Sequence, residues 1–347
     1  MKSAVKGNLS AEVYMHAEFK RAFDQCKGFA ELAEPGSLCT CVGASGAGKS
    51  ELAKIIGPAI YGDSETWRDG ERPYILVTAD NPERGYFSPK ELTHSILSAL
   101  DDPFRASPLR LAENGMDNEF VEALRGGDVR RSRSTSEPVM RQVVEDIAPH
   151  KRLTLIIVDE ANMLALTQRN RIPTDYLEGL RILGKKAGCR ILLLGTVDLL
   201  LFGNYSAQLN RSEIRVHLNR MRCEDEKGKA EFAALVGKLA NKWKVSAVAT
   251  NKDIALMYDW TYGVPGEVDQ RFKLAAIRCW GCSEQIGWAD VRDCKPSKEE
   301  IERIRVEADI IQAVMDDVPL SVQQAKALKR RKRGQMNPRR VQVKASL

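Results

Sequence analysis

The chain has 347 residues, of which 43% are hydrophobic and 29% charged, and its formal net charge is +6. This composition excludes a disordered chain, and the length accommodates one large domain and a smaller one. The longest apolar runs are strand-length, too short to cross a bilayer, and the first thirty residues contain no signal-peptide core. We therefore expect a soluble, cytoplasmic protein.

The eight cysteines are scattered, and Cys279 and Cys282 form a close pair without a second pair to complete a zinc site. This scattered distribution of cysteines indicates reduced thiols in a reducing compartment. Positive charge gathers in residues 321–347, which hold nine Lys or Arg and no acid, whereas the rest of the chain has a net charge of −3. Such a segment binds nucleic acid or an acidic protein surface, unless it is simply a solvated terminus.

Apolar periodicity predicts an N-terminal helical lead-in over residues 1–35, with amphipathic spacing across 9–33. Strands then alternate with helices. The predicted strands are 38–43, 74–79, 153–160, 189–196 and 213–218. The predicted helices are one from residue 50, then 89–100, 139–150, 173–187 and a segment near 198–210, while 101–138 has a loop composition. Nearly continuous apolar strands predict an α/β fold with a parallel sheet covered on both faces.

After Met221 only helical patterns follow, so we predict a domain boundary there. The predicted organisation is the lead-in of residues 1–35, a core of residues 36–221, a small helical domain of residues 222–318 and the basic tail of residues 319–347. The sequence contains no internal repeat.

Residues 43–50, GASGAGKS, match the P-loop pattern between a predicted strand and a predicted helix. Glycines let backbone N–H groups face a phosphate chain, and the start of the helix adds positive potential. Lys49 is suited to the β- and γ-phosphates of ATP, and the Ser50 hydroxyl to Mg²⁺. The predicted nucleotide-binding residues are Gly43, Ala44, Ser45, Gly46, Ala47, Gly48, Lys49 and Ser50.

The strand LTLIIVDE places Asp159 and Glu160 at its carboxyl end, where ligands bind in open α/β sheets. We predict that Asp159 holds Mg²⁺ and that Glu160 polarises the water that attacks the γ-phosphate. The alternative is that both acids cap the following helix. Thr196, at the end of the strand ILLLGT, either senses the γ-phosphate or caps a helix. Arg211 is the predicted arginine that a neighbouring subunit donates to stabilise charge on the γ-phosphate.

These motifs resemble those of the AAA+ ATPases, with the helical patterns after the core in the position of a lid. More narrowly, the sequence resembles the transposition regulators of the TnsC, TniB and MuB kind, through GTVDLL followed by AQLNR, the segment TYGVPGEVDQRF over 261–272 and the helical lead-in. One departure concerns the lid. Glu267 stands where many AAA+ proteins carry an arginine, and Arg271 lies one turn later.

The resemblance implies a sheet with strand order 5-1-4-3-2 and ATP bound between subunits. It also implies a homo-oligomeric ring or helical filament around double-stranded DNA, a transposase as partner and, in some systems, a target-selecting adaptor of the TniQ kind. Charge suggests where DNA would bind, since flexible basic loops follow a phosphate backbone without reading bases. The candidate DNA contacts are Arg125, Arg130, Arg131, Arg133, Arg169 and Arg171.

Three functions remain open at this stage. The leading hypothesis is an ATP-dependent DNA-binding regulator of transposition. A helicase loader similar to DnaC and IstB would use the same ATPase but prefer single-stranded DNA. A signalling NTPase of the STAND type would use the core as a nucleotide-gated switch, although such proteins normally carry long repeat domains.

Overall fold

The computed structural model describes seven stretches of the chain: residues 14–79, 87–100, 136–166, 173–201, 213–280, 285–322 and 324–325. These residues belong to two compact units. The first lies within residues 1–25, 41–52 and 215–334, and the second within 26–40, 53–214 and 335–347. None of the helices in the described stretches has the length and apolar character needed to span a bilayer.

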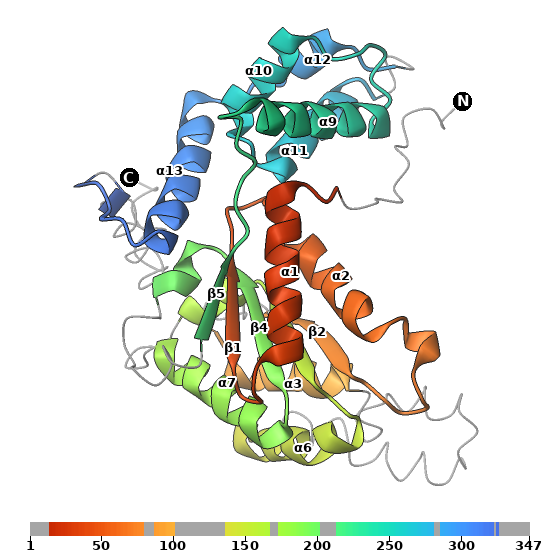
Figure 1. Cartoon of the computed structure of the whole chain (residues 1–347), viewed down its shortest axis with the longest axis vertical. Coiled ribbons are helices and arrows are strands. Elements are labelled where there is room, and N and C mark those ends of the chain that lie inside the picture. The colour runs from red at the N-terminus through yellow and green to blue at the C-terminus, as the bar shows by residue number, and fades with distance from the viewer. Residues whose placement is uncertain are drawn as a thin grey trace, which may run out of the picture. The chain divides into compact units, whose positions relative to one another are not determined.

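Five strands form one parallel sheet in the order β2-β3-β4-β1-β5 (Figure 1). They are β1 (Leu38–Val42), β2 (Tyr74–Thr78), β3 (Leu155–Asp159), β4 (Arg190–Gly195) and β5 (Glu213–His217). Read from the other edge, this is the order 5-1-4-3-2, so the expected topology is confirmed. The register between neighbours is continuous, as Tyr74 pairs with Leu155 and Leu155 with Arg190.

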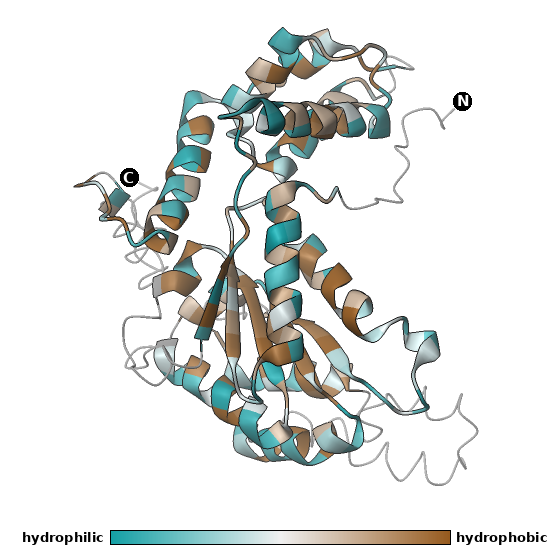
Figure 2. Ribbon diagram, in the orientation of Figure 1, coloured by the Kyte–Doolittle hydropathy of each residue, from teal (hydrophilic) through white to brown (hydrophobic). Residues whose placement is uncertain are grey.

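The central strands are buried on both faces, which explains their uninterrupted apolar sequences. Every residue of β1 is buried, and in β3 only the last residue, Asp159, is partly exposed. Figure 2 shows the strands largely in the hydrophobic colour, while the helices mix hydrophobic and hydrophilic turns. A strand with polar alternation would expose one face to water, so the sequence pattern and the helical cover agree.

Among the described residues, the helices that accompany the sheet are α1 (Ala17–Leu32), α2 (Lys49–Tyr61), α3 (Pro89–Ala99), α6 (Glu137–His150) and α7 (Pro173–Ala187). In the second unit α3 packs on β2 and α6, α6 packs on α7, and α7 packs on β4. The described residues also form short 3₁₀ helices. η1 (Ser64–Thr66) lies between α2 and β2, η2 (Ala161–Ala165) follows β3, and η3 (Val197–Leu201) follows β4. The helix predicted near 198–210 begins as η3, and residues 202–212 lie outside the described residues.

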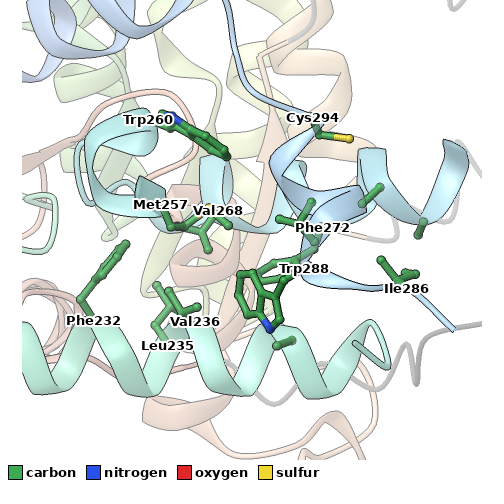
Figure 3. Packing of buried hydrophobic residues seen from close by; sticks show 14 of the residues in the cluster. Phe232, Leu235, Val236, Met257, Trp260, Val268, Phe272, Ile286, Trp288 and Cys294 are labelled. Atoms are coloured by element: carbon green, nitrogen blue, oxygen red, sulfur yellow. The ribbon is translucent and has the colours of Figure 1, made fainter. Parts of the chain in front are cut away.

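Helices follow β5, as predicted: α9 (Glu226–Lys242), α10 (Asn251–Thr261), α11 (Pro265–Arg278), α12 (Trp288–Arg292) and α13 (Lys298–Met315). They share a hydrophobic core in which Phe232 and Val236 of α9 face Val268 and Phe272 of α11 (Figure 3). Side-chain caps fix the starts of α9, α10 and α13. The domain boundaries proposed from the sequence remain predictions.

Candidate functional site

The loop after β1 can be built only with glycine at particular positions. A Cβ on Gly43 would lie 2.7 Å from the Leu218 carbonyl oxygen, closer than packed atoms allow. Gly46 and Gly48 have φ angles of +79° and +103°, in the left-handed region that side chains disfavour. The glycines of GASGAGKS are therefore required by the shape of the loop itself.

Lys49 closes this loop from the side of helix α2. Its ammonium donates hydrogen bonds to the carbonyl oxygens of Gly43, at 2.9 Å, and Ala44, at 2.8 Å. The side chain is only 7% exposed, so its charge is held in place. Helix α2 begins at Lys49, and the N–H groups of a first helical turn carry positive partial charge. Together these groups form a site suited to phosphate.

The start of helix α11 contacts the same loop within the first unit, through Gly266 in its first turn and its N-cap residue Val264. The Gly266 N–H donates to the Gly46 carbonyl oxygen at 2.8 Å. A Cβ on Gly266 would lie 2.6 Å from that oxygen, and a Cβ on Gly46 would lie 3.3 Å from Val264. We call this contact the Gly46–Gly266 clasp. Sequence reasoning missed it, although the paired glycines of GVPG were a usable signal for close backbone approach.

The start of helix α1 contacts the loop as well. A Cβ on Gly48 would lie 3.3 Å from the ring of Phe19. His16 caps α1, because its Nδ1 accepts the Phe19 N–H at 3.3 Å. This imidazole is 4% exposed, and burial lowers its pKa to about 4. His16 is therefore neutral at neutral pH, which the cap requires, since a protonated Nδ1 has no lone pair to accept the bond.

The acidic pair lies in the second unit, at the end of β3. The Glu160 N–H donates to Oδ1 of Asp159 at 2.9 Å, so Asp159 stabilises the turn that follows the strand. Glu160 adopts the left-handed conformation, with φ 52° and ψ 32°, at a cost on the order of 1 kcal/mol for a non-glycine residue. Its side chain makes no cap hydrogen bond to η2. The Glu160 carboxylate is therefore not used as a helix cap.

Thr196 follows β4, and its hydroxyl donates to Oδ2 of Asp198 at 3.4 Å. Asp198 is 7% exposed, and its Oδ1 has no hydrogen-bond partner within the described part of the chain. Sequence reasoning did not single out Asp198, although an acid between apolar residues directly after a buried strand was a signal. The hydroxyl of Thr196 is thus oriented by a buried carboxylate.

Most of the predicted arginines fall on residues whose structure is not described. Arg125, Arg130, Arg131, Arg133, Arg169, Arg171 and Arg211 all lie outside the described residues, and their roles stay predictions. Arg271 of α11 is described. It is 4% exposed and makes ion pairs of 3.5 Å with Glu267 and Glu300. Burial raises the pKa of Glu267, and Arg271 opposes this shift. Arg271 is therefore anchored among the helices that follow β5.

The described cysteines and acids do not form a metal centre. Over the described stretches, no group of three or more His, Cys, Asp or Glu side chains is placed to hold a metal ion. Burial raises the pKa of the Cys189 thiol to about 12, so this thiol is unreactive at neutral pH. Cys282, the second member of the close pair, lies outside the described residues.

Part of the chain is similar to known proteins. The family model of the AAA domain matches residues 33–201. The arabinose import ATP-binding protein AraG of Pseudomonas syringae pv. syringae (strain B728a) is 32% identical over 122 residues, which are 35% of this chain and 22% of that protein. The chain thus spans less than a quarter of the length of this curated relative.

Two solved structures share the fold. The ORC2 protein of Aeropyrum pernix in its ADP form is 14% identical with a TM-score of 0.50, over 82% of this chain and 69% of that one. Drosophila ORC bound to DNA is 12% identical with a TM-score of 0.50, over 92% of this chain and 75% of that one. At these identities the two structures show a shared fold, which agrees with the sheet order, and the match to the AAA domain model covers residues 33–201 alone.

Proposed function

We propose that the chain is an ATP-dependent, DNA-binding AAA+ ATPase that regulates DNA transposition. The main observation in favour of ATP binding is the buried Lys49 ammonium, which is hydrogen-bonded to the glycine loop at the start of α2. Support for transposition comes from the sequence, through GTVDLL, AQLNR and TYGVPGEVDQRF. The oligomer on duplex DNA would direct and activate a transposase at its target, in some systems together with a TniQ-like adaptor.

The residues present fit ATP and Mg²⁺. Lys49 supplies a point charge for the β- and γ-phosphates, and the loop supplies backbone donors. The Ser50 hydroxyl and the Asp159 carboxylate are oxygen ligands, the kind that Mg²⁺ prefers. When bound, Mg²⁺ would neutralise part of the phosphate charge. Both residues follow strands of one parallel sheet, whose carboxyl ends carry ligands in this fold class.

Hydrolysis is assigned to side chains after β3 and β4. Glu160 would orient the attacking water and accept its proton, a role for which its carboxylate is not engaged as a cap. Thr196 would accept a hydrogen bond from the same water, because its own proton is directed to Asp198. Arg211 of a neighbouring subunit would stabilise the charge on the γ-phosphate.

The nucleotide would control assembly through a population shift. If ATP binds better to subunits assembled on DNA than to free subunits, it favours the polymer, and hydrolysis favours release. The fold relative from Drosophila is described as bound to DNA, which agrees with a DNA-binding role. The basic residues Arg125, Arg130, Arg131, Arg133, Arg169 and Arg171 would contact phosphates and not base edges.

The test uses the full chain, a duplex of random sequence and electron microscopy together with fluorescence anisotropy. We expect decorated duplex with ATP and bare duplex with ADP, with affinities differing by about tenfold or more, and weaker binding as salt rises. Lys49→Ala should abolish the ATP effect. Equal binding with ATP, ADP and no nucleotide, or binding insensitive to salt, would contradict the proposal.

Two further measurements separate the alternatives. A helicase loader would bind single-stranded DNA more tightly than duplex, and a STAND-type switch would bind neither in a nucleotide-dependent way. The transposition role is tested by adding a purified transposase with donor ends and scoring strand transfer into a duplex target. Transfer should depend on this chain and on ATP. If transfer were the same with and without the chain, the transposition role would be lost while the ATPase assignment remained.

A further inference from the structure

The turn between helices α10 and α11 has an unusual backbone. Tyr262, which caps the C-terminus of α10, adopts the left-handed conformation, with φ 52° and ψ 29°. Residues with bulky side chains rarely adopt this conformation. Gly263 follows with φ 75°, and a Cβ on it would lie 2.1 Å from the Met221 carbonyl oxygen. The turn therefore needs glycine at position 263, and at position 262 it holds a tyrosine against its backbone preference.

The same turn leads directly into the Gly46–Gly266 clasp. The Gly263 carbonyl oxygen accepts the Met221 N–H at 2.9 Å, which fixes the turn against the segment after β5. The Gly266 N–H then donates to the Gly46 carbonyl oxygen at 2.8 Å. All of these residues belong to the first unit. Because only three residues separate Tyr262 from Gly266, the backbone of Tyr262 determines where the clasp is placed.

The side chain of Tyr262 is held at its ring and at its hydroxyl. The guanidinium carbon of Arg220 lies 3.8 Å from the ring centroid, and that of Arg305 lies 5.6 Å from it. The hydroxyl donates to Oδ1 of Asp309 at 2.9 Å. Burial and the bond to Asp309 raise the pKa of Tyr262, so the hydroxyl keeps its proton at neutral pH. These contacts offset the cost of the left-handed backbone.

The partners of Tyr262 are themselves anchored. Arg220 follows β5, and its guanidinium donates to the Tyr258 hydroxyl of α10 at 2.8 Å. Arg305 and Asp309 both belong to α13, which packs on α10. The side chain of Tyr262 is thus held between the segment after β5 and helix α13, so the position of α13 is transmitted to the turn.

We propose that Tyr262 is a positioning residue for nucleotide binding, because its contacts with Arg220 and α13 hold the turn on which the Gly46–Gly266 clasp is built. The inference rests on the proposed binding of ATP by the glycine loop. Glycine adopts a left-handed backbone without strain, so a turn that needed only this backbone would not require a tyrosine. Loss of the tyrosine contacts should weaken ATP binding and leave turnover of bound ATP unchanged, since hydrolysis is assigned to side chains of the second unit.

The test measures ATP affinity by calorimetry and turnover by phosphate release, on the full chain. Tyr262→Gly gives the turn the residue that suits its backbone but removes the ring and the hydroxyl. We expect the dissociation constant for ATP to rise by about tenfold, while kcat at saturating ATP stays within about twofold. Tyr262→Phe keeps the ring beside Arg220 and should recover most of the affinity, leaving a rise of about threefold.

Two variants of α13 complete the test. Asp309→Ala removes the acceptor of the Tyr262 hydroxyl and should also raise the dissociation constant by about threefold. Combined with Tyr262→Phe it should cause no more loss than the larger single effect, because both changes remove one hydrogen bond. Glu299→Ala is the matched control. It removes an exposed carboxylate from the first turn of the same helix, about 15 Å from Asp309 along the axis, and should leave ATP affinity unchanged.

Three results would overturn the proposal. They are normal ATP affinity in Tyr262→Gly, a loss of kcat as large as the loss of affinity, and an equal loss of affinity in Glu299→Ala. If Tyr262→Gly did not fold, normal affinity in both Tyr262→Phe and Asp309→Ala would overturn it instead. In each case the wild-type chain would still bind ATP, and the proposed function would stand. A wild-type chain without affinity for ATP would end both proposals.

Discussion

The glycine loop of residues 43–50 and the acidic strand ends are built on different principles. The loop needs glycine at position 43 because the Leu218 backbone lies too close for a Cβ, and at positions 46 and 48 because φ is positive there. One side chain, that of Lys49, completes the site. At the strand ends the backbone is ordinary apart from Glu160, and side chains such as Asp198 set the geometry. The loop should therefore be sensitive to added atoms, and the strand ends to changed charge.

The largest expected effects separate binding from turnover. Lys49→Ala removes a buried ammonium, and we expect ATP affinity to fall by about tenfold to a hundredfold, because hydrogen bonds to charged groups contribute roughly 1.5–3 kcal/mol. Glu160→Gln keeps the shape but removes the base. Turnover should fall by about a hundredfold to ten-thousandfold while ATP affinity stays within about twofold. Calorimetry measures binding, and phosphate release measures turnover.

The two variants also control for each other. Both change one side chain, yet only one is expected to weaken the nucleotide complex. If Glu160→Gln turned over ATP at the normal rate, another group would have to be the base. If Lys49→Ala bound ATP normally, the loop would not be the phosphate site, whatever the motif indicates.

The next effect tests the Gly46–Gly266 clasp. Gly266→Ala adds a methyl group 2.6 Å from the Gly46 carbonyl oxygen, so α11 must shift or the loop must deform. Overpacking of this kind costs about 1–3 kcal/mol. Because the strained atoms are those of the glycine loop that we propose binds the phosphates, we expect ATP affinity to fall by roughly tenfold, measured by calorimetry.

The matched control is Gly237→Ala in α9. A Cβ there meets no atom within 4 Å, and alanine in a helix interior is about 1 kcal/mol more favourable than glycine. This variant should unfold at a slightly higher temperature and bind ATP normally. Equal ATP affinity in both variants would show that the clasp does not support the loop.

The two regions differ in how far the sequence predicted them. The glycine loop and the strand order could be anticipated, because few residues satisfy the backbone of a P-loop and because buried parallel strands have a recognisable apolar pattern. The clasp could not, since Gly46 and Gly266 are far apart in sequence and neither carries a side chain whose chemistry would suggest a partner. Contacts between backbones leave almost no trace in composition.

The sequence did not predict the contacts of Asp198 and Arg271, for a related reason. Both are charged residues that the fold buries, and burial depends on elements that are distant in the chain. The segment GTVDLL placed Asp198 directly after a strand but gave no partner, and Thr196 supplies one. Arg271 pairs with Glu300, and the two are 29 residues apart. Charge in a sequence predicts a solvated surface unless the packing is known.

A smaller effect concerns pH and the helix that contacts the loop. Burial lowers the pKa of His16 to about 4, below its ordinary value of 6.5, so the unfolded state binds the proton more tightly. Stability is fully present above the unfolded pKa and is lost as pH falls from 6.5 towards 4. Between about pH 7 and pH 5 the loss should be about 2 kcal/mol of unfolding free energy.

His16→Asn is the variant that isolates this effect. Asparagine can accept the same cap bond from the Phe19 N–H but does not titrate. Urea unfolding at several pH values should show the wild-type chain losing more stability than the variant as pH falls. His217, whose pKa is also lowered to about 4 by burial, is present in both and cancels. Parallel curves for the two proteins would contradict the assignment.

The smallest expected effect probes the strand ends by charge alone. Asp198→Asn keeps the volume of a buried side chain and replaces the charged acceptor of the Thr196 proton with a neutral amide oxygen, which is a weaker acceptor. If Asp198 holds the Thr196 hydroxyl in an accepting orientation, turnover should fall by about fivefold, the equivalent of roughly 1 kcal/mol for one hydrogen bond, with KM for ATP unchanged.

Thr196→Val removes the hydroxyl and should give a loss at least as large, and the double variant should lose no more than Thr196→Val alone, because both changes act on one interaction. Additive losses would mean that Asp198 acts independently of Thr196, for example through its second oxygen, which has no partner within the described stretches. Asp198 and Thr196 would then contribute to turnover through different interactions. The difference between the two regions would still hold, because turnover would respond to charge at the strand ends and ATP binding to atoms added at the glycine loop.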